Sequence, residues 1–217
     1  MKKIIGMLFL LILSTTANAV ILYDSGDPID TSGRCVAEGC LGSTEWSIIS
    51  EFTADQHWDI TGFQFFATDN NEINGNGGDG IGLGIESYQS TSWQIISSDD
   101  PFGPALFSGQ TTATTNTYNL NNIDVTDFLL SNLTLSLDKG TYFLAQHHDF
   151  SDESEFLVLE SGYRSDYYQT DNLTGEYKIN GTVAVKIIGT VPEPALFGLF
   201  GLALVGLGFS RKKKVRS

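Results

Sequence analysis

The feature that most constrains this chain is an uninterrupted apolar run near its C-terminus. From Ala195 to Phe209 every residue is apolar or glycine. As an α-helix at about 1.5 Å per residue, the run would rise roughly 22 Å, which is most of a ~30 Å hydrocarbon core. We therefore predict a transmembrane helix over residues 195–210, with the folded part of the chain before it.

The apolar run is bounded on both sides. Pro192 and Pro194 precede it, and regular structure should end there because proline cannot donate a backbone N–H. The basic residues that follow it are Arg211, Lys212, Lys213, Lys214 and Arg216. By the positive-inside rule this basic cluster stays in the cytoplasm, so it acts as a stop-transfer signal.

The order of these parts resembles a known sorting signal. Val191-Pro192-Glu193-Pro194, then a short apolar helix, then a terminal Arg/Lys cluster is similar to the PEP-CTERM signal of Gram-negative bacteria. In that family an exosortase, a membrane protease-transferase, processes exported proteins destined for the cell surface or an exopolysaccharide matrix. The resemblance implies that residues 191–217 are a sorting domain, anchored in the inner membrane until the exosortase processes it. A plain tail anchor is the alternative.

The N-terminus has the features of a signal peptide. Two lysines precede an apolar segment from Ile4 to Leu13, and an A-x-A cleavage motif ends at Ala19. We predict that residues 1–19 are removed by cleavage between Ala19 and Val20. An uncleaved anchor is the alternative. Both ends of the chain then carry cytoplasmic signals, and residues 20–190 form an exported domain.

The exported body is strongly acidic. The chain has 26 Asp and Glu and 12 Lys and Arg, and seven of the basic residues but only one acid (Glu193) lie in the two targeting segments. The body therefore has 25 acids, five basic residues and a net charge of −20. Such a charge opposes binding to nucleic acid and to anionic lipid.

The periodicity of the body is that of β-strands. Apolar residues alternate with polar or small ones in Ile60–Phe65, Leu133–Leu137 and Val183–Ile187. Further strand-like runs are Trp46–Phe52, Gly82–Tyr88, Ser92–Ser97, Ala105–Ser108, Thr141–Gln146 and Phe156–Leu159. Only Val125–Leu130 could form a helical turn. We predict an all-β fold, an antiparallel β-sandwich or jelly roll.

Part of the body also resembles the exported domain often seen ahead of this tail. The matching pieces are Trp93, Pro104, Leu106-Phe107-Ser108-Gly109 and the segment Leu137–Tyr142 with its Leu-x-x-Gly-Thr-Tyr pattern. This resemblance favours the β-sandwich and implies no catalytic residue.

Cys35 and Cys40 are the two cysteines of the chain. An even pair in an exported protein predicts one disulfide, which closes a short loop and contributes about 2–3 kcal/mol by the chain-closure model. Half of a zinc site is the alternative, but no second pair of ligands lies nearby in the sequence.

A Gly/Asn-rich segment is the candidate metal site. Its potential oxygen ligands for calcium are Asp69, Asn71, Glu72, Asn74 and Asp79. The EF-hand spacing fails, because a loop that starts at Asn70 has Ile81 at its twelfth position instead of Glu. We favour the alternative, a hairpin loop without a cofactor, whose glycines and asparagines serve the turn.

His147-His148-Asp149 is the other candidate cluster. Adjacent residues of a strand point to opposite faces, so both histidines could bind one metal only in a loop. We find none of the common hydrolase or phosphate-loop motifs. Three functions remain: a non-enzymatic surface or matrix protein, which we favour; a carbohydrate-binding module that could depend on calcium; and a secreted hydrolase.

Overall fold

The computed structural model describes residues 19–35, 46–69, 88–121, 123–151, 156–171 and 175–192. Residues 19–190 form one compact unit, and residues 1–18 and 191–217 belong to a second. The strands are β1 (Val20–Asp24), β2 (Pro28–Cys35), β3 (Trp46–Ala54), β4 (Trp58–Asp69), β5 (Tyr88–Ser97), β6 (Ala105–Thr111), β7 (Thr114–Leu120), β8 (Ile123–Leu130), β9 (Leu135–Leu137), β10 (Gly140–Phe150), β11 (Phe156–Asp171), β12 (Gly175–Val183) and β13 (Val185–Thr190).

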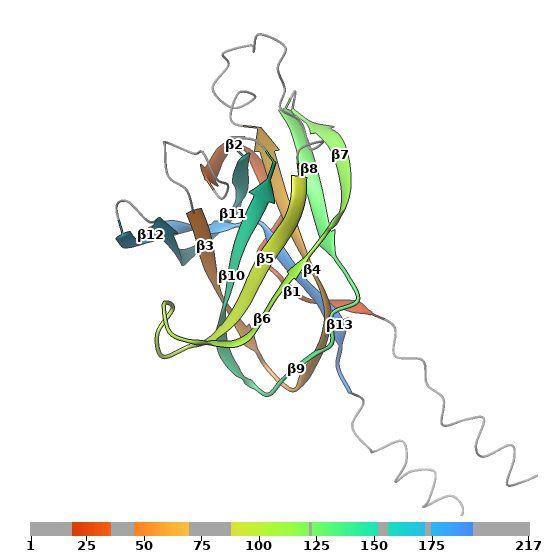
Figure 1. Cartoon of the computed structure of the whole chain (residues 1–217), viewed down its shortest axis with the longest axis vertical. Coiled ribbons are helices and arrows are strands. Elements are labelled where there is room, and N and C mark those ends of the chain that lie inside the picture. The colour runs from red at the N-terminus through yellow and green to blue at the C-terminus, as the bar shows by residue number, and fades with distance from the viewer. Residues whose placement is uncertain are drawn as a thin grey trace, which may run out of the picture. The chain divides into compact units, whose positions relative to one another are not determined.

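The strands pair into two antiparallel layers (Figure 1). One layer runs in the order β6, β5, β10, β3 and the second half of β11. The other runs in the order β1, β13, β4, β8 and β7. The short β9 continues the β8 edge of β4. The body is therefore an all-β antiparallel sandwich, and the predicted fold class is confirmed.

The long strand β11 joins the two layers. Its residues 167–171 pair with β3 in one layer, and its residues 156–158 pair with β4 in the other. Strands β2 and β12 also pair with β11. The register of the β11–β12 pairing shifts between Ser161 and Asp166, as a bulge requires. A strand that bends at such a bulge can serve both layers of a sandwich.

Strand β4 supplies much of the core, and a bulge sets which of its side chains are buried. The β4–β13 register shifts at Thr61, so one extra residue lies on β4. Side chains of a strand alternate between its two faces, and the extra residue reverses which positions face the core. Trp58 and Ile60 before the bulge are therefore buried together with Phe63 and Phe65 after it.

Aromatic rings fill the space between the layers. Phe128 of β8 lies with its ring centroid 4.9 Å from that of Tyr88 and 5.0 Å from that of His148. Phe63 of β4 meets Trp93 of β5 edge-on at 5.5 Å. These contacts join strands of the two layers, so they form the interior of the sandwich.

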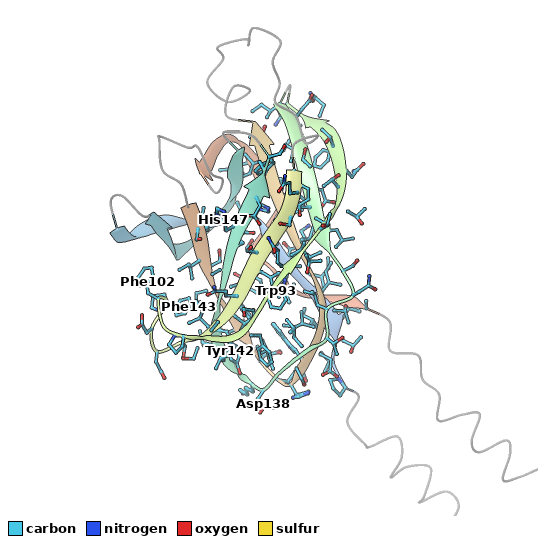
Figure 2. The ribbon with its side chains drawn as sticks, viewed as in Figure 1. Trp93, Phe102, Asp138, Tyr142, Phe143 and His147 are labelled. Carbon is cyan, nitrogen blue, oxygen red and sulfur yellow. The ribbon has the colours of Figure 1, made fainter. Side chains whose placement is uncertain are left out.

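The outer face of the β10 layer is also partly covered. Ile49, Ile96, Phe143 and Ala145 form a buried cluster, and Phe102 of the β5–β6 loop packs against it. Figure 2 shows Phe102 beside Phe143. The loop covers apolar residues on the outer face of β5 and β10, and the other layer covers their inner face. Both faces of these strands therefore carry buried apolar residues.

The structure shows the conformation of two segments that the sequence left open. The segment Val125–Leu130, which could have formed a helical turn, is most of the strand β8 and pairs with β4 and β7 on its two sides. In the Leu-x-x-Gly-Thr-Tyr segment, Leu137 is buried and the Tyr142 hydroxyl donates to the Asp138 carbonyl at 3.0 Å. The tyrosine thus closes the turn that enters β10.

Candidate functional site

The first candidate site is the point where the chain leaves the sandwich. Strand β13 ends at Thr190, which pairs with Asp59 of β4. Its neighbour Gly189 pairs with β4 on one side and with Val20 of β1 on the other. Val191 then follows outside the sheet. The sorting signal predicted from the sequence thus begins directly after the last paired residue of the body.

Gly189 is required by the close approach of three strands. A Cβ at this position would lie 2.2 Å from the Asp59 carbonyl oxygen and 2.7 Å from Cδ1 of Leu22. Real Cβ atoms do not approach backbone oxygen so closely, so any larger residue would push the end of β13 away from β4. The exit of the chain is therefore tightly held by β1 and β4.

A polar cluster lies beside this exit. Pairing places Thr190, Asp59 and Ser136 in one row across β13, β4 and β9, which spans about 10 Å at ~4.8 Å between strands. His57 joins the row: its Nδ1 is 2.9 Å from Asp138 Oδ1, and its Nε2 is 2.9 Å from Ser136 Oγ. Figure 2 shows Asp138 at one end of the sandwich, away from His147.

The order Ser136, His57, Asp138 is that of a serine-hydrolase triad, but a second carboxylate changes its chemistry. Ser136 also donates to Asp59 Oδ1 at 3.0 Å. A hydroxyl has one proton, so while Ser136 donates to Asp59 it can only accept from a protonated Nε2–H of His57. The hydrogen bond to Asp138 raises the pKa of His57, and the charge of Asp59 adds to this. The geometry favours an imidazolium between two carboxylates over a general base.

This cluster makes a testable prediction. We expect the pKa of His57 to lie above 6.5, and Asp138→Asn to lower it, because the substitution removes the negative charge and keeps the shape. Stabilisation by this group is present below pH 6.5 and is lost as the pH rises through the raised pKa. An NMR titration of the three histidine rings measures it, with the exposed neighbour Lys139→Gln as the control. An unchanged His57 pKa in Asp138→Asn would contradict the ion pair.

The adjacent histidines of β10 point to opposite faces, as predicted. His147 faces outward, with Nε2 3.4 Å from Asp149 Oδ1. Asp149 Oδ2 also accepts hydrogen bonds from Ser90 at 2.8 Å and Gln110 at 3.0 Å. His148 is fully buried, with Nδ1 2.8 Å from Thr91 Oγ1. The two rings therefore cannot bind the same metal ion.

Several predicted site residues fall outside the described ranges. Of the calcium candidates, Asp69 ends β4, while Asn71, Glu72, Asn74 and Asp79 lie outside. Cys35 ends β2, but Cys40 lies outside, and the disulfide stays a prediction. Within the ranges that the structure describes, no three His, Cys, Asp or Glu side chains form a group that could hold a metal.

The targeting segments are described only at their edges. Ala19 precedes β1, and Val20 is its first residue, so the predicted cleavage point lies where the body begins. Glu193, Pro194, the predicted helix over 195–210 and the basic cluster lie outside the described residues. Among the described residues, no helix has the length and hydropathy needed to cross a membrane.

Sequence reasoning missed the His57 cluster. His57 and Asp138 are 81 residues apart and belong to different hairpins. The available signal was the turn chemistry around Asp138-Lys139-Gly140, which marks a strand end but does not say which other turn lies beside it. Only the pairing of β9 with β4 brings the two turns together.

Comparison with known proteins identifies the C-terminal segment. No curated protein matches the chain. Among solved structures, the group B streptococcus pilus 2b backbone protein aligns at 12% identity over 76% of this chain and 56% of that chain, with a TM-score of 0.14. So low a score carries no structural argument, and the alignment spans little more than half of the pilus protein. A family model described as a PEP-CTERM protein-sorting motif matches residues 190–212. The chain therefore carries a PEP-CTERM protein-sorting motif directly after a body that is an all-β antiparallel sandwich.

Proposed function

We propose that this chain is a non-enzymatic surface or matrix protein that an exosortase releases from the inner membrane after export. The observation that carries the proposal is the sorting motif at residues 190–212, which starts at the final residue of the last strand. The body is then the exported domain, and residues 191–217 are its sorting signal. Its destination would be the cell surface or an exopolysaccharide matrix.

The chemistry of the described polar clusters supports a body without catalysis or cofactor. His57 is placed as an imidazolium between carboxylates, and Asp149 is engaged by neighbouring side chains. His148 is fully buried between the two layers, against Phe128. The net charge of −20 also gives the body long-range repulsion from anionic lipid, which suits a protein that leaves the membrane.

A carbohydrate-binding role is the other function that the sequence suggests. The residues that would carry it are the calcium candidates and the side chains of Tyr163, Tyr167 and Tyr168. These side chains lie outside the described part of the chain.

Substitutions in the sorting motif test the proposed function. The two prolines disfavour the α region for Val191 and Glu193, so the motif should stay extended outside the bilayer, where a processing enzyme can bind it. Replacing Pro192, Glu193 and Pro194 by alanine should leave export and membrane insertion intact and block processing. The measurement is the C-terminal mass of the protein recovered from a host that contains an exosortase.

The control for this variant is Arg216→Gln, which leaves the motif and most of the basic cluster in place and should be processed normally. Identical C-terminal ends in the wild type and the triple-alanine variant would leave the tail as a plain anchor and remove the basis of the proposal.

A further inference from the structure

The spacing between the sandwich and the sorting motif is unusually small. Thr190 is paired with Asp59, and only Val191 and Pro192 separate it from Glu193. At ~3.3–3.6 Å per extended residue, the chain from Thr190 to Glu193 can span at most about 11 Å. Along the chain, the residues that the sorting enzyme must bind therefore follow the last strand of the folded β-sheet with almost no linker.

A processing enzyme that binds its substrate as an extended strand would need more free chain than this. Extended peptides are bound through their backbone N–H and C=O groups, usually over several residues. On the N-terminal side of the motif, the next residues are Gly189 and Thr190, and their backbones belong to β13. Gly189 is flanked by strands on both sides. The groups that an enzyme would use are already engaged inside the sheet.

We propose that the end of β13 limits processing: Gly189 and Thr190 must leave β1 and β4 before the exosortase can bind the motif productively. This inference rests on the proposed function, because it concerns the same reaction. The sandwich would thus make the rate of release depend on the local opening of its last strand, and a chain whose exit is firmly paired would stay longer in the membrane.

The expected size of the effect follows from the pairing. Each backbone hydrogen bond that must open lowers the fraction of accessible chain by roughly two- to tenfold. Gly189 is paired with β1 and with β4, so its hydrogen bonds on both sides belong to the pairing that must open. Opening is local, because Thr190 is the last residue of the strand and the rest of β13 can stay paired with β4.

The most direct test fixes the end of β13 to β4 with an engineered disulfide. Asp59 and Thr190 are directly opposite each other in an antiparallel pair, where Cα atoms are about 4.5–5.5 Å apart, and this suits a disulfide. In the full-length double variant Asp59→Cys, Thr190→Cys, processing in membranes that contain an exosortase should be more than about tenfold slower when oxidised. Reduction with dithiothreitol should restore it. The wild type with and without dithiothreitol controls for Cys35, Cys40 and the enzyme.

The converse variant places a flexible linker between the end of β13 and the sorting motif. Six Gly and Ser residues inserted between Thr190 and Val191 keep the strand paired and move the motif away from it. Processing should become at least about twofold faster than in the wild type. Gly109→Ala is the matched control for general destabilisation, because its Cβ would lie 2.6 Å from the Trp93 ring, in the other layer. It should be processed at the wild-type rate.

The outcomes separate this inference from the proposed function. Equal rates for the wild type, the insertion and the oxidised double variant would overturn the inference and leave sorting intact. An acceleration in Gly109→Ala equal to that in the insertion would also overturn it, because global unfolding would then be the cause. A wild type that is never cut, while the same enzyme cuts another PEP-CTERM protein, would overturn the proposed function itself.

Discussion

Replacing Phe128 by alanine should lower the free energy of unfolding of the body, residues 20–190, by about 3–5 kcal/mol. Phe128 is fully buried, and its ring packs against Tyr88 at 4.9 Å and His148 at 5.0 Å. Truncation removes the buried ring and leaves a cavity between the layers, which neighbouring strands cannot fill without breaking their pairing. For a marginally stable domain this is a large share of the total.

Urea denaturation followed by tryptophan fluorescence measures this effect, because Trp58 and Trp93 are both buried in the native body. The control is Leu106→Ala, since this side chain is 51% exposed and its loss should change stability by no more than about 0.5 kcal/mol. Equal losses in the two variants would contradict a core built between β4–β8 and β5–β10.

Acid should destabilise the body through His148. Burial lowers the pKa of this imidazole from 6.5 to about 3, and the charge of His147 adds to the shift. Between these pH values the unfolded chain binds a proton that the native chain does not, so stability is highest above pH 6.5 and falls as the pH drops. From pH 7 to pH 4 the loss from this one group is about 3 kcal/mol.

The variant His148→Leu separates this contribution from that of the carboxylates. Thr91 Oγ1 keeps a partner in it, because the Tyr88 hydroxyl lies 2.9 Å away. We expect the unfolding free energy of the variant to fall by about 3 kcal/mol less than that of the wild type between pH 7 and pH 4. Parallel pH profiles for the two proteins would show that His148 is not buried in its neutral form.

The sequence predicts the fold class where burial alternates. Phe63, Phe65 and the β13 residues Val185 and Ile187 have period-two spacing, and all four are buried. Burial at such positions can be predicted without knowing which strand pairs beside them, because one face of each strand must be apolar in any sandwich. The opposite orientation of His147 and His148 follows from the same rule.

The sequence does not reveal strands with few buried residues. In β7, Thr114–Leu120, most residues are exposed, and only Tyr118 and Leu120 pack against the core, while the backbone pairs along β8. The register of β4 could not be predicted either, since the bulge at Thr61 is defined only by the pairing of β4 with β13. The same long-range pairing assembles the cluster around His57, so its residues could not be grouped from local patterns.

The central claim is that residues 191–217 are a sorting address for the body. The most direct measurement is the intact mass of the wild-type protein purified from two otherwise identical hosts, one with an exosortase and one without. We expect the full C-terminus, ending at Ser217, in the host without the enzyme. With the enzyme we expect a product that has lost the basic tail, cut close to Pro192-Glu193-Pro194. The mass also distinguishes hydrolysis, which adds water to the cut bond, from transfer to an amine. A tail that still ends at Ser217 in both hosts would contradict the account.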